Sequence, residues 1–293
     1  MTATTAETHP RSWREAWRDP SLKLQRTLAM VLLLCQGGIT VTGSLVRVTG
    51  SGLGCDTWPL CHEGSLVPVA GAAPWIHQAI EFGNRLLAFV VAAAAGLVLF
   101  AVIRAGRRKD IKTLAWISLI GVVVQAVIGG ISVRLDLRWW SVAVHFLPSM
   151  VLVFVAAMLY MRIAETDSAV PTRRYPGSAQ TWTLIAAAAL CLVLVTGTMV
   201  TGSGPHSGDA GVGMEGRLQM DTRVLAYVHS VCMYLYLIAT IITTVLLRNS
   251  GAPDDAKRTA YVLIAMILVQ WAIGVIQFRM GVPRWTIPAH IAM

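Results

Sequence analysis

The chain alternates between long apolar stretches and short polar segments that are rich in glycine, proline and basic residues. Apolar runs of about 20 residues are long enough to cross a bilayer as helices. The pattern predicts seven spanning helices, near residues 28–46, 78–103, 113–132, 141–161, 181–200, 223–247 and 259–278. An eighth begins near residue 285 and reaches Met293 after about two turns. We therefore expect an all-α integral membrane protein with eight transmembrane helices, the eighth truncated in this sequence.

The second half of the chain repeats the first. A shift of 145 residues aligns VVVQAVIGGI (122–131) with ILVQWAIGVI (267–276). The same shift aligns His145 with His290, Arg134 with Arg279, and Asn84 with His229. A looser match joins VTGSLVRVTGSG (41–52) to VTGTMVTGSG (195–204). Internal repeats of this kind determine the architecture of a protein.

Each half holds four predicted helices, so both halves have the same orientation in the membrane. We expect two tandem four-helix bundles related by a pseudo-two-fold axis along the membrane normal. The predicted parts are a cytoplasmic N-terminal arm, an N-terminal bundle, a cytoplasmic linker and a C-terminal bundle, at 1–25, 26–165, 166–180 and 181–293.

The composition agrees with a membrane protein and excludes an ordinary water-soluble enzyme. Hydrophobic residues make up 55% of the chain and charged residues 13%, whereas a soluble domain carries roughly 25% charged residues. The net charge of +9 comes largely from the N-terminal segment and from the segments after the second, fourth and sixth helices. Basic segments stay in the cytoplasm, so both chain ends are expected there. The charge therefore orients the protein and does not indicate nucleic-acid binding.

Three histidines fall at similar depths near the outer ends of predicted helices. These are His145, His229 and His290, and Asn84 occupies the fourth corresponding position. A single histidine here could be an ordinary hydrogen-bonded residue, but ionisable groups inside a bilayer are costly and usually functional. Two imidazoles from adjacent helices can take both axial positions of a haem iron, whereas zinc needs three or four ligands. We therefore expect the three histidines to bind haem iron.

Several arginines lie near the same outer ends of the helices. A guanidinium group binds carboxylates such as haem propionates with a two-pronged fork. The alternative is that these side chains only extend to the membrane interface. The candidates for haem binding are Arg47, Arg85, Arg134 and Arg279, of which the repeat duplicates the last two.

The first outer segment and the following helix carry further candidate chemistry. Cys55 and Cys61 flank DTWPL on the oxidising side of the membrane, where a disulfide is favoured. A redox-active pair is the alternative. Glu81 precedes Asn84 by three residues and Arg85 by four. It either forms an ion pair with Arg85 or serves as a catalytic carboxylate that moves protons beside a substrate.

The stretches LVRVTGSGLGCDTWPLC (45–61) and IEFGNRLL (80–87), followed by the histidines, resemble the haem A synthase family. The resemblance implies an oxidoreductase of the bacterial cytoplasmic membrane that converts the C8 methyl of haem O to the formyl group of haem A. It implies a haem B cofactor between His229 and His290, a substrate haem at His145 and Asn84, and a role for Glu81 in catalysis.

The resemblance also implies partners and one departure from the family pattern. Haem A serves terminal oxidases, so the expected partners are haem O synthase (the farnesyltransferase), oxidase assembly factors and the lipid membrane. Association of the chain with further copies of itself is left open. The family has histidine at the position of Asn84, and an amide is a poor iron ligand. The substrate haem is then expected to be held by His145 alone.

Two other functions share part of the pattern. A dihaem b-type electron carrier also needs paired histidines, but it leaves Glu81 and the cysteine pair unexplained. A transporter built on parallel repeats would explain the repeat, but it would place polar residues at mid-depth, whereas these residues gather near the outer ends.

Overall fold

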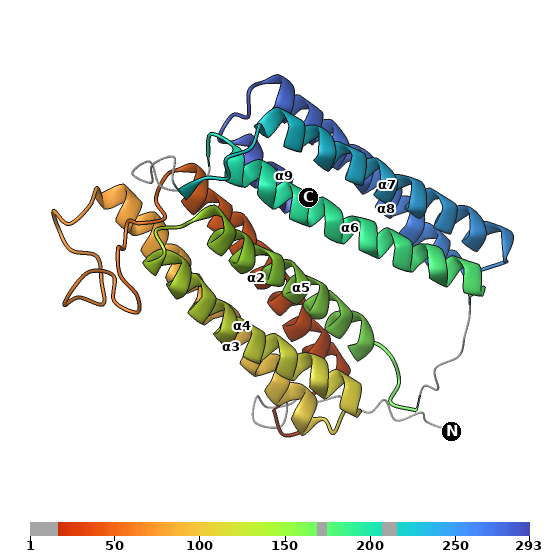
Figure 1. Ribbon diagram of the computed structural model, residues 1–293. Helices are drawn as coiled ribbons and strands as arrows, with labels where there is room; N and C mark the ends of the chain where they lie inside the picture. The colour runs from red at the N-terminus through yellow and green to blue at the C-terminus, as the bar shows by residue number, and fades with distance from the viewer. Residues whose placement is uncertain (1–16, 169–174, 207–215) are drawn as a thin grey trace, which may run out of the picture.

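The computed structural model describes residues 17–168, 175–206 and 216–293, and its long elements there are all helices (Figure 1). They are α2 (Leu22–Val48), α3 (Trp75–Arg104), α4 (Lys109–Arg134), α5 (Trp139–Ile163), α6 (Gly177–Ser203), α7 (Thr222–Asn249), α8 (Asp254–Arg279) and α9 (Thr286–Ala292). Among the described residues, seven helices, α2 to α8, are long and apolar enough to cross a membrane. The expected all-α integral membrane fold is therefore confirmed.

Every predicted span lies inside an observed helix, and the observed helices are longer. α2 begins inside the predicted arm at 1–25, because the Ser21 side chain caps it and accepts a hydrogen bond from the Leu24 amide at 3.2 Å. α6 begins inside the predicted linker at 166–180. Polar residues continue a helix beyond the hydrocarbon region, so the apolar run alone underestimates helix length. Residues 1–16 of the arm and 169–174 of the linker lie outside the described residues.

Most of the long helices end in a basic residue. The last turns of α2, α3, α4, α5, α7 and α8 each contain an arginine: Arg47, Arg104, Arg134, Arg162, Arg248 and Arg279. A cation there interacts favourably with the helix dipole, by about 0.3–1 kcal/mol at an exposed end. Three of the four candidate haem-binding arginines therefore have a structural reason to stand where they do, whatever else they bind.

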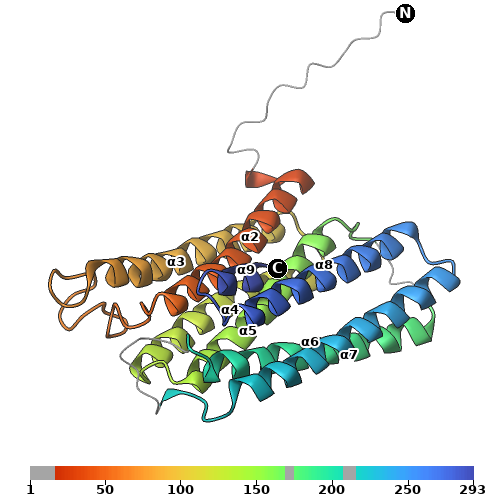
Figure 2. The same cartoon turned by 90° about the horizontal axis from the view of Figure 1, so that it is seen from above.

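Consecutive long helices run in opposite directions and lie side by side (Figures 1 and 2). We call the loop side of the molecule the side on which α3, α5, α7 and α9 begin and α2, α4, α6 and α8 end. The segment between α2 and α3 projects from this side (Figure 1). The assignment of the loop side to the outside of the cell stays a prediction.

A compact apolar core joins α2, α3, α4 and α5. Its fully buried members include Leu32, Val98, Ile111 and Leu159. These residues lie in the first part of α2 and α4 and in the last part of α3 and α5. The core therefore fills the end of the first bundle that is remote from the loop side. Asn84 and the other candidate site residues lie toward the opposite end.

The second half is packed more openly. α6 and α7 pack closely against each other, whereas the buried residues of α8 are only Ala260 and Ile267. α9 packs against both α8 and α2, and α5 packs against α6. Figure 2 shows α9 beside α2 and α8. The two halves thus meet along two helix pairs, one of which places the helix that carries His290 against the first half.

Candidate functional site

His229 on α7 and His290 on α9 form a facing pair near the loop side. Their ring centres are 6.4 Å apart and their ring planes are inclined by 61°. Two metal–nitrogen bonds of about 2 Å each, with about 1 Å more from each nitrogen to its ring centre, would separate the centres by about 6 Å. The pair therefore has the spacing of two axial ligands on one iron.

Residues of α6 hold the His229 ring in the orientation that a ligand needs. Its Nδ1 atom lies 3.0 Å from the carbonyl oxygen of Val193 and 3.2 Å from Oγ1 of Thr196. A carbonyl can only accept, so Nδ1 carries the proton and Nε2 keeps the lone pair that binds a metal. A Cβ atom at Gly197 would lie 3.2 Å from Cε1 of His229. The glycine therefore leaves the ring room to pack against α6.

His290 has a comparable partner on α8. The Gln270 amide nitrogen donates to the His290 carbonyl oxygen at 2.6 Å. Within the described part of the chain, Nδ1 of His290 and Oε1 of Gln270 are buried without a hydrogen-bond partner. Such groups are costly when left unpaired. With its proton on Nδ1, His290 has the tautomer that ligation through Nε2 requires.

The first half carries the corresponding contacts at the aligned positions. Thr42 on α2 donates from Oγ1 to Oδ1 of Asn84 on α3 at 2.7 Å, where the second half has Thr196 and His229. Gln125 on α4 lies against His145 on α5. In the amide orientation that satisfies both of its ends, its nitrogen donates to Nδ1 of His145 at 2.8 Å, so Nε2 carries the proton there. Each candidate ligand position thus contacts a polar side chain on a neighbouring helix, and ligation through Nε2 of His145 requires Gln125 to turn its amide oxygen toward Nδ1.

The donor set fits an iron held in a porphyrin better than a bare metal ion. Among the described residues, no group of three or more His, Cys, Asp or Glu side chains is placed to hold a metal ion. Zinc in a structural site needs four such ligands, whereas a haem needs protein atoms only along its axis. His229 and His290 are the residues that would hold such an iron, and glycines lie beside both rings, Gly197 at His229 and Gly274 at His290.

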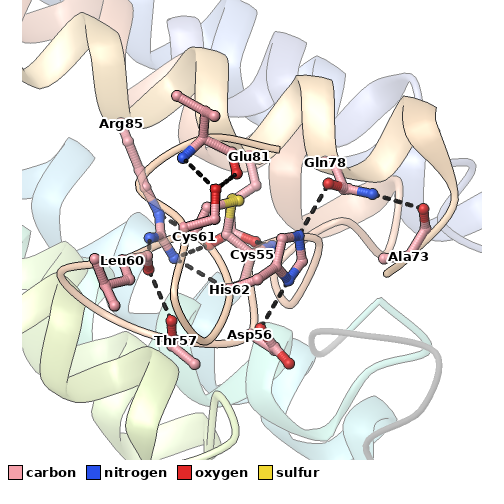
Figure 3. Close-up of a disulfide and its surroundings, with 12 residues drawn as sticks. Cys55, Asp56, Thr57, Leu60, Cys61, His62, Ala73, Gln78, Glu81 and Arg85 are labelled. Carbon is pink, nitrogen blue, oxygen red and sulfur yellow. Dashed lines mark hydrogen bonds and ion pairs between the residues drawn. A yellow bond between two sulfur atoms is a disulfide. The ribbon is translucent and has the colours of Figure 1, made fainter. Parts of the chain in front are cut away.

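Glu81 on α3 binds the segment that joins α2 to α3, residues 49–74 (Figure 3). Its side chain is only 7% exposed, and Oε1 accepts from Nη2 of Arg85 at 2.6 Å and from Nε at 3.2 Å. Oε2 accepts from the Cys55 amide at 2.6 Å. Arg85 also donates to the carbonyl oxygens of Cys55 and Leu60, both at 3.0 Å. The expected ion pair is present, and it ties the segment to α3.

The same segment contains the expected disulfide between Cys55 and Cys61, and both cysteines are fully buried. His62 links it further to α3, because its two ring nitrogens lie 2.9 Å from Oδ1 of Asp56 and 2.9 Å from Oε1 of Gln78 (Figure 3). Gln78 in turn donates to the carbonyl oxygen of Ala73 at 2.7 Å. The disulfide thus lies inside a hydrogen-bonded cap at the start of α3.

The segment also docks on α4. Arg134 donates from Nη2 to the Trp58 carbonyl oxygen at 2.7 Å and from Nε at 3.2 Å. A Cβ atom at Gly130 would lie 2.2 Å from the Trp58 ring, so only glycine leaves room for the indole. Arg134, which the sequence assigned to a haem propionate, holds this segment in the structure.

The other candidate arginines have separate surroundings. Arg47 crosses from the first half to the second, donating from Nε to the carbonyl oxygen of His206 at 2.9 Å and from Nη2 to that of Thr201 at 3.3 Å. Arg279 is exposed at the end of α8. The four arginines therefore do not form one cluster, although all lie toward the loop side.

A family described as cytochrome oxidase assembly protein (COX15-CtaA) matches residues 26–293. The chain belongs to this family. Curated relatives named heme A synthase include one from Exiguobacterium sp., 36% identical over 147 residues, which are 48% of this chain and 44% of the relative. One from Bacillus licheniformis is 32% identical over 147 residues, with the same coverage of 48% and 44%. One from Listeria welshimeri is 29% identical over 151 residues, 50% of this chain and 47% of the relative. The chain spans about half the length of the curated relatives it matches.

Sequence reasoning did not single out four side chains that support the candidate ligands in this family member. They are Thr42, Gln125, Thr196 and Gln270. The signal was available, because both glutamines and both threonines lie inside the aligned repeat segments. A polar residue that recurs at the same place in two apolar helices indicates a buried hydrogen bond.

Proposed function

We propose that this protein oxidises the C8 methyl group of haem O to the formyl group of haem A. Curated relatives named heme A synthase support a role in the formation of haem A. Membership of the cytochrome oxidase assembly family supports the proposal. Conversion of a methyl group to a formyl group, written with water as the source of oxygen, is –CH3 + H2O → –CHO + 4 H+ + 4 e–. The protein therefore needs a substrate site, a group that takes up protons and a path for electrons to an external one-electron acceptor.

The difference between the two halves is the observation that carries the proposal. The second half presents two imidazoles at the spacing of axial ligands, and such a site suits a permanently bound haem B that transfers electrons. The first half has His145 at the position aligned with His290 and an amide, Asn84, at the position aligned with His229. A haem with one protein ligand is easier to release, which suits a substrate that must enter and leave.

Other side chains of the chain have supporting roles in the proposal. Haem O is bound on the loop side of the first half, with His145 as its iron ligand. Glu81, one turn before Asn84 on α3, takes up or delivers the protons that oxidation of the methyl group releases. Arg85 holds the Glu81 carboxylate in place during this step. Arg47, Arg134 and Arg279 are candidates for the propionate groups.

Alanine variants at the histidines test the assignment of the two sites. His145→Ala should lose haem O and product while keeping haem B. His290→Ala should lose haem B and all turnover. His77→Ala is the control, because this imidazole bonds Ser51 at 2.8 Å outside both candidate pairs; it should keep both haems. The measurement is chromatography and mass analysis of haems extracted from each purified variant. Loss of the same haem in both ligand variants would contradict two separate sites.

A further inference from the structure

The two aligned sites differ at one ligand position, Asn84 against His229, while a threonine on the preceding helix lies beside each. In the second half, Thr196 lies 3.2 Å from Nδ1 of His229. In the first half, Thr42 lies 2.7 Å from Oδ1 of Asn84. The threonine therefore engages the amide oxygen of Asn84 in the place where its counterpart engages the ring nitrogen that does not bind metal.

The remaining end of the Asn84 side chain cannot replace an imidazole as a ligand. An amide nitrogen is a hydrogen-bond donor without a lone pair available to a metal. The amide also ends one covalent bond, about 1.3 Å, nearer its own Cβ than the Nε2 atom of a histidine does. The oxygen, which does have lone pairs, already accepts a hydrogen bond from Thr42 that holds it toward α2. The free end of the Asn84 side chain thus offers N–H groups instead of a ligand.

The packing of the first bundle agrees with space at this position. The apolar core of α2 to α5 fills the end remote from the loop side, and Asn84 and His145 are both only partly buried. A Cβ atom at Gly129 would lie 3.1 Å from Cε1 of His145, so glycine at this position of α4 leaves the imidazole room. The buried apolar core does not extend to Asn84 and His145.

We propose that a haem in the first half is bound through His145 on one face only, and that Asn84 leaves the other face open to a small exogenous ligand. The ligand class is a compact lone-pair donor, such as carbon monoxide or cyanide, which the Asn84 N–H groups face. This proposal rests on the proposed function in one respect, namely that a haem occupies the first half. The facing histidines leave the haem of the second half closed to such ligands.

The test uses the full chain loaded with both haems and reduced with dithionite, with carbon monoxide as the probe. Extraction of the haems first gives the number of haems bound per chain. In the unchanged protein, the carbon monoxide difference spectrum should account for one of the two haems. Asn84→His should abolish that signal and give two six-coordinate, low-spin haems. His229→Asn, the reciprocal change, should create a second haem that binds carbon monoxide.

The outcomes separate this proposal from the function on which it rests. Two haems per chain without a carbon monoxide signal would overturn the open position and leave the proposed function standing. Uptake of only one haem per chain, all of it haem B, when haem O is also supplied would overturn both. Oxidised protein titrated with cyanide gives the same answer without a variant, so a failure of Asn84→His to fold does not remove the test. Binding of cyanide to half of the haem is the expected result.

Discussion

Replacement of Glu81 by glutamine separates the two roles that this carboxylate can have. The side chain accepts hydrogen bonds from Arg85 and from the Cys55 amide, and it lies one turn from Asn84. A glutamine keeps the size and one acceptor oxygen. It removes the charge and turns an N–H group toward one of the two donors.

The contacts give the size of the expected effect. Glu81→Gln loses at least one hydrogen bond to a charged partner, worth about 1.5–3 kcal/mol of unfolding free energy. Glu81→Ala loses all three bonds and leaves Arg85 without its carboxylate, which costs about 3–5 kcal/mol for a buried pair. Arg85 is 19% exposed and keeps two carbonyl acceptors, so we expect the low end of that range.

The effect on turnover is separate from the effect on stability. Loss of a positioned proton-transfer group lowers a rate by about 10²- to 10⁴-fold. Glu81→Gln should therefore retain both haems and accumulate haem O or a hydroxylated intermediate. The assays are thermal unfolding in detergent and haem analysis by chromatography and mass. The matched control is Glu63→Gln, the same change at an exposed glutamate of the same segment.

Two results would refute this reasoning, and they refute different parts of it. An unchanged yield of haem A in Glu81→Gln would remove the proton-transfer role. An unfolding temperature equal to that of Glu63→Gln would show that the carboxylate does not anchor the segment.

Three further predictions concern other parts of the chain. Gly130→Ala places a Cβ atom 2.2 Å from the Trp58 ring. Overpacking should lower the free energy of unfolding by about 1–3 kcal/mol. The control in the same unfolding assay is Gly83→Ala, whose added Cβ atom meets open space. Gln270→Leu removes the amide that bonds His290. This variant should retain less haem B and shift the midpoint potential of that haem, because residues that hydrogen-bond a metal ligand commonly change metal affinity by about 10- to 100-fold. An unchanged midpoint potential would contradict the role of Gln270 in supporting His290. The Arg108 side chain holds the pKa of the Glu165 carboxyl below its usual value by hydrogen bonding. The carboxylate therefore stabilises the fold above pH 4.5, and this contribution is lost as pH falls through the lowered pKa, so Glu165→Gln should flatten the acid side of the stability profile relative to the unchanged protein.

The sequence predicted the helices well because lipid imposes a simple rule on every span. Each segment must be apolar and must satisfy its own backbone, and the seven predicted spans all lie within observed helices. The ends were placed several residues too far inside. Ser21 and the polar residues after it belong to no apolar run, yet the Ser21 cap starts α2 there.

The candidate site was predictable as a set of residue types but not as a set of contacts. The repeat singled out His229 and His290 by their depth, the family resemblance implied that they pair, and the structure brings their rings together. The contact of Arg134 with Trp58 could not be read from the sequence. It depends on how a segment between helices folds back, and such segments have no periodicity from which a direction could be inferred.

The most direct test of this account is the identity and number of haems in the purified full chain. The haems are extracted, separated by chromatography and identified by mass. We expect haem B together with haem O, haem A or a hydroxylated intermediate, since we propose a cofactor site in one half and a substrate site in the other. Haem B alone, at two per chain, would contradict the synthase and indicate a membrane electron carrier.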